Sequence, residues 1–96
     1  MKQLDILATL EAVIQDRLSN PKAESYTAEL AAAGQLKVAQ KFGEEAVETV
    51  VAAVAEDDTR LTAEAADLIY HLLVLLNLRG LSLADVAAEL ERRHQP

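Results

Sequence analysis

The 96-residue sequence has no cysteine and no tryptophan, and it contains only three glycines and two prolines. The missing cysteine excludes disulfides, zinc thiolate sites and thiol nucleophiles. The glycines and prolines are too few for the many turns of an all-β domain. Hydrophobic residues make up 51% of the chain but aromatic residues only 3%, so any core is mainly aliphatic. This composition is typical of close-packed helices, and we expect one all-α domain spanning residues 1–96.

Positive charge and long apolar runs are also scarce. Nine Lys and Arg residues face 16 Asp and Glu residues, which gives a formal charge of −7. Such a chain repels nucleic-acid backbones and anionic membranes. The longest apolar runs, 50–55 and 72–76, are far shorter than the roughly 20 residues of a membrane span, and the first residues lack a signal-peptide pattern. We therefore expect a cytoplasmic protein with no nucleic-acid or membrane partner.

Apolar residues recur at helical spacing through most of the chain. The pattern predicts helices over residues 4–18, from Ser25 or Thr27 to a pause at Gly34, over 35–56, from Asp58 or Thr59 to 79, and over 83–93 after a capping box at Ser82. Residues 19–24, which contain Pro21, are predicted to form a loop. Short connections favour an antiparallel bundle of four to five helices. Because such thin helices bury more surface by pairing chains, we also expect a homodimer.

The predicted helix over 35–56 carries carboxylates in unusual surroundings. Residues 46–55 include only two polar side chains, so this segment is expected to be largely buried, and Glu48 with it. Glu45 lies three residues before Glu48 and Glu44 lies four before it. Side chains at these spacings converge on one face of a helix.

The next predicted helix repeats the pattern, with Glu64 and Asp67 three residues apart in an otherwise apolar stretch. If the helices are antiparallel neighbours, about four carboxylates meet in one partly dry pocket. A buried carboxylate must be protonated, paired with a cation or bound to a metal. Neither 42–56 nor 61–78 contains Lys or Arg, so we expect neither helix to supply a local cation at the site. Oxygen ligands alone favour Mg²⁺, with Mn²⁺ as the alternative, although acidic residues on helices are often simply solvated.

Other polar residues allow two interpretations. Lys37 and Lys41 precede the acidic segment and form either ordinary surface pairs with glutamates or a cationic rim for phosphate oxygens. Arg92 and Arg93 lie at the end of the last predicted helix, where cations favour the helix dipole, and they are weaker candidates for a phosphate contact. A lone histidine on an apolar face, such as His71, is more often a hydrogen-bonded core residue than a ligand.

Three segments together resemble a known family. They are Ser-Tyr-Thr-Ala-Glu-Leu at 25–30, Lys-Phe-Gly-Glu-Glu-Ala-Val-Glu at 41–48, and Glu-Ala-Ala-Asp-Leu-Ile-Tyr-His-Leu-Leu at 64–73. From about Leu4 to His94, the chain resembles the phosphoribosyl-ATP pyrophosphatases. This family belongs to the all-α nucleoside-triphosphate pyrophosphohydrolases. The resemblance implies hydrolysis of phosphoribosyl-ATP to phosphoribosyl-AMP and pyrophosphate, the second step of histidine biosynthesis, by Mg²⁺-assisted attack of water.

The resemblance also implies roles for individual residues. The implied metal ligands are Glu45, Glu48, Glu64 and Asp67, and the implied catalytic residues are Glu44 and Glu48. Glu44 is implied either to contact the metal ligands without binding the metal or to act as a base that orients water. Residues implied to meet the phosphates are Ser25, Thr27, Lys37 and Lys41, with Arg92 and Arg93 as lesser candidates. Family members often have Gly where this chain has Glu24, and they form dimers with the site near the subunit interface.

Three alternative functions stay open. They are clearance of non-standard nucleotides, a non-enzymatic helical interaction module and a metal-storage bundle.

Overall fold

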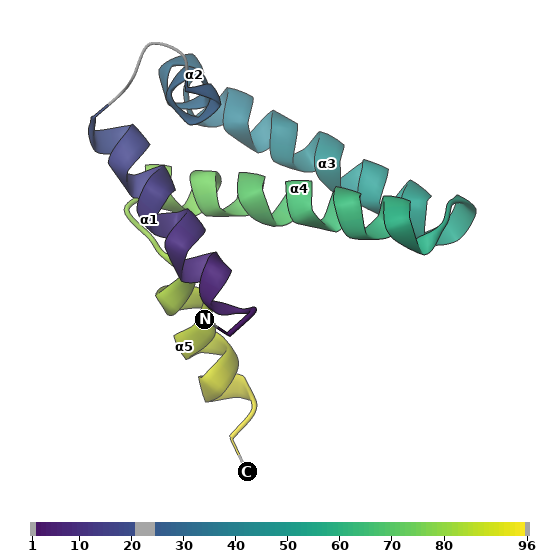
Figure 1. Ribbon diagram of the computed structural model, residues 1–96. Coiled ribbons are helices and arrows are strands. Elements are labelled where there is room, and N and C mark those ends of the chain that lie inside the picture. Colours follow the sequence, from purple (N-terminus) through teal and green to yellow (C-terminus); the bar gives the residue numbers. More distant parts are fainter. Residues whose placement is uncertain (1, 21–24, 96) are drawn as a thin grey trace.

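The computed structural model describes residues 2–20 and 25–95, and this part of the chain forms five helices and no strand. The helices are α1 (Asp5–Ser19), α2 (Tyr26–Ala33), α3 (Gln35–Ala55), α4 (Asp58–Leu78) and α5 (Leu83–Arg93), as labelled in Figure 1. The predicted all-α class is confirmed. The predicted loop at Pro21 and the position of Glu24 lie outside the described residues.

Local sequence signals set most of the helix ends. The Ser25 hydroxyl accepts a hydrogen bond from the Ala28 amide at 3.2 Å and caps α2. Gly34 separates α2 from α3 with a φ of 98°, and Gly80 follows α4 with a φ of 75°, in a region that favours glycine. Ser82 and Asp85 form the predicted capping box of α5.

One predicted cap is wrong. Asp57, rather than Asp58 or Thr59, caps α4, because its carboxylate accepts the Arg60 amide at 2.9 Å. Asp58 is already the first helical residue, where its charge favours the positive end of the helix dipole. Three acidic or hydroxyl residues in a row made the position of the cap ambiguous in the sequence, since each can accept a hydrogen bond from a free amide.

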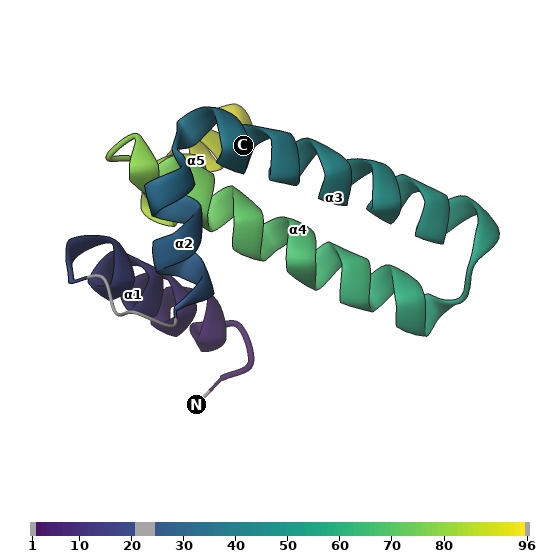
Figure 2. The ribbon, with the colours of Figure 1, turned by 90° about the horizontal axis from the view of Figure 1, so that it is seen from above.

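Helices α3 and α4 form a long antiparallel hairpin with the most extensive packing in the molecule. Figures 1 and 2 show α1 and α2 beside the open end of this hairpin and α5 projecting from the same end. The core lies at that open end. It consists of the buried side chains of Ile14, Leu30, Val38, Leu73 and Val74.

A polar network joins α2 to α4 within the core end. His71 is 5% exposed, and its Nδ1 donates to the Asp67 carbonyl at 2.7 Å while Nε2 lies 3.1 Å from the Tyr26 hydroxyl. The hydroxyls of Thr27 and Tyr70 are hydrogen-bonded to each other. Both ring nitrogens of His71 are therefore used within the fold, and the prediction of a core histidine is confirmed.

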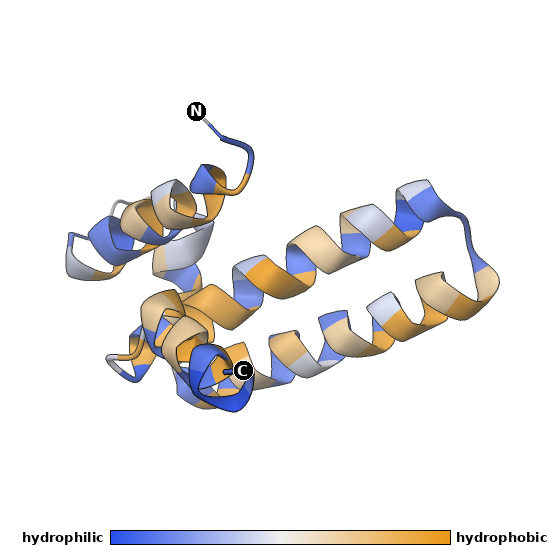
Figure 3. Cartoon of the chain, turned by 90° about the horizontal axis from the view of Figure 1, so that it is seen from below, coloured by the Kyte–Doolittle hydropathy of each residue, from blue (hydrophilic) through white to orange (hydrophobic). Residues whose placement is uncertain are grey.

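The composition of segment 46–55 predicts that it is largely buried, but in the single chain this prediction is wrong. Ala52 is buried, but Val50 is 63% exposed and Val54 81% exposed. Figure 3 shows hydrophobic segments along both helices of the hairpin. Because α3 packs mainly against α4, on one side, its outer face has no neighbour in the described part of the chain.

Within residues 2–20 and 25–95, α4 is the one helix that is long and apolar enough to cross a membrane by length and composition, with a mean hydropathy of 1.4 over its most apolar stretch. Core helices of globular proteins also meet this criterion. In this structure α4 lies along α3 and carries the buried residues Glu64, His71, Leu73 and Val74.

Candidate functional site

Three of the predicted ligands meet between α3 and α4. Glu45, Glu48 and Glu64 each place one carboxylate oxygen within 4.8 Å of the other two. Glu45 and Glu48 share a face of α3 because they are three residues apart, and Glu64 faces them from α4. Glu64 is only 6% exposed, whereas Glu45 is half-buried and Glu48 is exposed. Glu48 therefore lies at the solvent edge of this carboxylate cluster rather than in the core.

Two carboxylate oxygens of the cluster are buried without a partner. Glu45 Oε2 and Glu64 Oε2 have no hydrogen-bond donor within the described part of the chain. Leaving a buried anionic oxygen without a donor is costly unless a proton or a cation compensates it. Oxygens that converge from two helices, with no sulfur or nitrogen ligand among them, are the donor set that hard divalent cations prefer. The carboxylate cluster therefore fits such a cation.

The electrostatics of Glu64 agree with this geometry. Burial raises the pKa of the Glu64 carboxyl, the neighbouring Glu48 raises it further, and Arg60 acts in the opposite direction. The carboxylates repel one another in the metal-free chain because they are close together. A cation that neutralised this repulsion would lower the pKa of Glu64.

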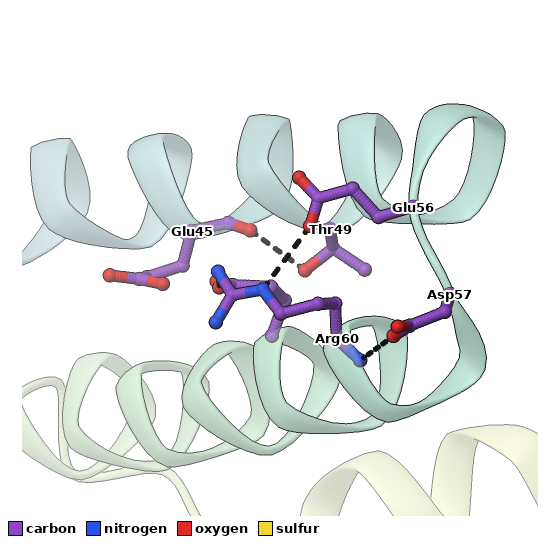
Figure 4. A network of polar contacts seen from close by, with 6 residues as sticks. Glu45, Thr49, Glu56, Asp57 and Arg60 are labelled. Atoms are coloured by element: carbon purple, nitrogen blue, oxygen red, sulfur yellow. Dashed lines mark hydrogen bonds and ion pairs between the residues drawn. The ribbon is translucent and has the colours of Figure 1, made fainter.

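Arg60 is the site residue that the sequence interpretation missed. Its Nη2 donates to Glu64 Oε1 at 2.6 Å and its Nε donates to Glu56 Oε2 at 3.2 Å. Figure 4 shows the Arg60 side chain extending from α4 into the space below Glu56 and toward Glu45. The expectation that no local cation reaches the carboxylates is therefore wrong. Arg60 lies just outside both segments that contain no Lys or Arg, and its i, i+4 spacing to Glu64 was the available signal.

An open groove of about 300 Å³ lies beside the carboxylate cluster. The residues that line it are Val47, Glu48, Val51, Glu56, Arg60 and Glu64. One wall is apolar and comes from α3, and the other residues are charged. The groove thus places an apolar surface, a guanidinium and carboxylate oxygens within reach of one bound molecule.

Two predicted site residues lie outside this group of oxygens. Asp67 is exposed and follows Glu64 by one turn, close enough for its charge to contribute to the raised pKa of Glu64. Glu44 is exposed, directly precedes Glu45 in the sequence, and accepts a hydrogen bond from Gln40 at 3.4 Å. The ligand role of Asp67 and the catalytic role of Glu44 stay predictions.

The predicted phosphate contacts are dispersed. Lys37 and Lys41 lie on α3 before Glu45, and neither forms an ion pair with any residue in 2–20 or 25–95. Ser25 caps α2, and the buried Thr27 hydroxyl is occupied by Tyr70. Their substrate contacts stay predictions, and Lys41 is the cation of this set closest in sequence to the carboxylate cluster.

Arg92 and Arg93 lie on α5, which projects from the opposite end of the hairpin (Figures 1 and 2). Both pair with Glu89, at 2.5 Å and 2.8 Å, and these hydrogen bonds lower the pKa of the Glu89 carboxyl. The fold of one chain does not bring these arginines to the carboxylate cluster. Their position in the last turn of α5 suits the helix dipole.

The chain is all-α, and both helices of its long hairpin contribute carboxylates to one cluster. These features define a helical protein with oxygen ligands suited to a divalent cation. The match with the model of the phosphoribosyl-ATP pyrophosphohydrolase family extends over residues 7–94 and includes the carboxylate cluster. The chain belongs to this family. The resemblance noted from the three sequence segments, and the hydrolase class that it implied, are therefore confirmed.

Several curated relatives are named phosphoribosyl-ATP pyrophosphatase. The phosphoribosyl-ATP pyrophosphatase of Sphingopyxis alaskensis is 59% identical over 91 residues, which cover 94% of this chain and 84% of the relative. That of Pyrobaculum islandicum is 60% identical over 89 residues, covering 93% and 95%. That of Rhizobium rhizogenes is 54% identical over 87 residues, covering 91% and 84%.

Proposed function

We propose that this chain hydrolyses phosphoribosyl-ATP to phosphoribosyl-AMP and pyrophosphate, the second step of histidine biosynthesis. The observation that carries the proposal is the family match over 7–94, which contains every residue of the carboxylate cluster. We also propose that residues 1–96 act as one cytoplasmic domain. The lack of cysteine is compatible with a reducing compartment.

Glu45, Glu48 and Glu64 are the proposed ligands of Mg²⁺, with Mn²⁺ as a substitute and Asp67 as a fourth ligand. The oxygens Glu45 Oε2 and Glu64 Oε2 support this assignment, because neither has a hydrogen-bond donor among the described residues and a bound cation would compensate both. Mg²⁺ supplies Lewis-acid chemistry when bound, since it neutralises phosphate charge and makes a water molecule more acidic.

The remaining proposed roles belong to the protein side chains. Glu44 or Glu48 orients the attacking water and accepts its proton, as a general base does. Lys41 holds phosphate oxygens at the end of the carboxylate cluster that lies farther from the hairpin corner. Lesser phosphate contacts are proposed for Ser25, Thr27 and Lys37. Arg92 and Arg93 are proposed as phosphate contacts only if the second chain of a dimer supplies them, because within one chain they lie at the other end of the hairpin. No covalent intermediate is required, because water attacks phosphorus directly.

The decisive experiment measures pyrophosphate release from phosphoribosyl-ATP with and without Mg²⁺, with ATP and dUTP as control substrates. Mg²⁺-dependent release from phosphoribosyl-ATP alone is the expected result. Release from ATP or dUTP alone would assign the protein to nucleotide clearance instead. If no substrate is cleaved and Mg²⁺ leaves the melting temperature unchanged, a non-enzymatic helical module is the better description.

We further propose a homodimer that buries the outer face of α3. Val50 and Val54 are 63% and 81% exposed in the single chain, lie outside the groove, and together form an apolar surface on one helix. Substitution Val54→Lys should convert the dimer to a monomer in sedimentation experiments, whereas Leu4→Lys, at an exposed position of the N-terminal segment, should leave it dimeric. A wild-type monomer at micromolar concentration would contradict the proposal.

A further inference from the structure

The groove beside the carboxylate cluster contains one cationic side chain, Arg60, and three carboxylates, those of Glu48, Glu56 and Glu64. Arg60 is 57% exposed, yet its guanidinium reaches the nearly buried Glu64 at 2.6 Å. An exposed arginine that turns back onto a buried carboxylate compensates a charge that burial would otherwise penalise. Arg60 therefore neutralises Glu64 through Oε1, while the other oxygen of the same carboxylate, Oε2, has no donor among the described residues. The guanidinium and a divalent cation would compete for this one negative charge.

Glu56 holds the other side of the same guanidinium. It is the C-cap residue of α3, and its Oε2 accepts Arg60 Nε at 3.2 Å. Arg60 itself lies in the first turn of α4, so this ion pair bridges the corner of the hairpin. If Glu64 were taken by a cation, Glu56 would still keep the guanidinium in the groove.

The Arg60 guanidinium group also has N–H donors that form no hydrogen bond within the described residues. An arginine side chain carries five N–H donors, and Arg60 uses one on Nε and one on Nη2 within the described residues. The planar fork of donors fits two oxygens of one phosphate group. No hydrogen bond occupies the other three donors in the described part of the chain, and Arg60 lines the same groove as Val47 and Val51.

The position of Arg60 complements that of Lys41. Because α3 and α4 are antiparallel, residues that precede the carboxylates on α3 lie away from the hairpin corner, and residues that precede them on α4 lie toward it. Lys41 precedes Glu45 by four residues and Arg60 precedes Glu64 by four. Along the hairpin, Lys41 and Arg60 therefore lie on opposite sides of the carboxylate cluster, an order that would suit a polyphosphate bound across it.

We propose that Arg60 is a counter-cation for Glu64 in the metal-free chain and a phosphate-binding residue once a divalent cation occupies the cluster. The ion pair with Glu64 is exchanged for contacts with phosphate oxygens, while Glu56 retains Nε. This inference rests on the proposed function for its substrate, but its metal-binding half is measurable without any substrate.

The experiment compares wild type with Arg60→Gln and Arg60→Lys. Calorimetric titration with Mn²⁺ alone should give a dissociation constant for Arg60→Gln at least about 3-fold lower than for wild type, because a competing positive charge is gone. The KM for phosphoribosyl-ATP at saturating Mg²⁺ should rise about 10-fold or more. Arg60→Lys keeps the charge but loses the fork, so its Mn²⁺ affinity should stay near wild type while its KM rises less.

Arg17→Gln is the matched control, because Arg17 also forms an ion pair, with Asp16 on α1, but lies outside the groove. It should leave both the Mn²⁺ affinity and the KM unchanged. Circular dichroism establishes that each variant is folded before either constant is compared. Arg60→Met, a second uncharged variant with the same expected results as Arg60→Gln, keeps both halves of the test valid if Arg60→Gln does not fold.

Unchanged Mn²⁺ affinity in Arg60→Gln would overturn the counter-cation role, and unchanged KM would overturn the phosphate contact. A brace that only stabilises the hairpin corner would lower the melting temperature and move neither constant. If wild type releases no pyrophosphate from phosphoribosyl-ATP, the proposed function fails at that earlier step, so the two failures are distinguishable.

Discussion

The two ends of the α3–α4 hairpin differ in whether their buried polar groups have hydrogen-bond partners. At the open end, where α1 and α2 pack, His71 uses both ring nitrogens, and Asn77 donates to Glu11 at 2.8 Å and to the Leu73 carbonyl at 2.8 Å. Nearer the corner, two carboxylate oxygens are buried without a donor. The buried polar groups of the core end are paired within the fold, whereas the corner end keeps an electrostatic cost that Arg60 offsets in part and a bound cation would relieve further.

The same contrast holds for apolar groups. Ile14, Leu73 and Val74 are fully buried at the open end. On the corner half of α3, Val50 and Val54 are mostly exposed although they are as hydrophobic as core residues. A single chain therefore buries the apolar side chains at only one end of its hairpin. Substitutions at the core end should lower stability, whereas substitutions at the corner end should affect activity or association.

The largest expected effect is the loss of activity on removing one charge from the carboxylate cluster. Glu48→Gln keeps the shape of the side chain, and it should lower kcat/KM for phosphoribosyl-ATP by about 100-fold or more, since a metal ligand contributes several kcal/mol of charge stabilisation. The fold should survive or gain stability, because repulsion between carboxylates is relieved. Pyrophosphate release and thermal melting measure the two effects. Glu91→Gln, at an exposed position on α5, is the control, and full activity of Glu48→Gln would refute the ligand assignment.

A substitution in the core end should have the reverse outcome. Leu73→Ala removes a fully buried side chain and should lower the free energy of unfolding by about 2–5 kcal/mol. Val51→Ala, at a groove position that is 45% exposed, should cost less than about 1 kcal/mol. Urea denaturation measures both values. Equal costs at the two positions would contradict the difference between the two ends of the hairpin.

The Asn77 network predicts a smaller loss of stability. Asn77→Ala removes the donors to Glu11 and Leu73 and the acceptor that Gln15 uses at 3.0 Å. It should lower the free energy of unfolding by about 1–2 kcal/mol, because Glu11 then keeps only the Leu83 amide as a partner. Gln40→Ala is the comparison, since its exposed side chain makes one hydrogen bond of 3.4 Å, and it should have almost no effect. A neutral Asn77→Ala would show that the network does not hold α1 and α5 in place.

The smallest expected effects are opposite pH dependences of two carboxyls. Burial raises the pKa of Glu64 above its ordinary 4.5, so its charged form destabilises the metal-free fold at neutral pH, and this cost is lost as the pH falls through the raised pKa. Arg92 and Arg93 lower the pKa of Glu89 below 4.5, so its contribution is present above 4.5 and is lost as the pH falls through the lowered pKa.

Denaturation in EDTA over a range of pH tests these signs. Glu64→Gln should be more stable than wild type at pH 7, and this advantage should shrink on acidification before any change is seen for Glu89→Gln. Glu89→Gln should be less stable than wild type at pH 7 and approach it only at more acidic pH. A common pH dependence for the two variants would contradict the opposite directions of the pKa shifts.

Much of the fold could be predicted because helix signals are local. Gly34, Gly80 and the Ser82 capping box mark helix ends through their own backbone and side-chain geometry, and all three predicted positions are confirmed. The predicted cap of α4 was wrong by one or two residues, since three adjacent residues can each accept the same amide. The three-residue spacing of Glu45 and Glu48 likewise predicts their common face from helix geometry alone.

The sequence by itself determined the all-α class, most of the helix boundaries and the presence of i, i+3 carboxylate pairs on two helices, because these depend on residues within a few positions of one another. Only the tertiary structure decided that Glu64 faces Glu45 and Glu48 while Asp67 lies outside the group, that Arg60 turns onto Glu64, and that the outer face of α3 is left exposed. These outcomes depend on the rotation and register of α3 against α4, which many distant apolar contacts fix together and no local pattern specifies.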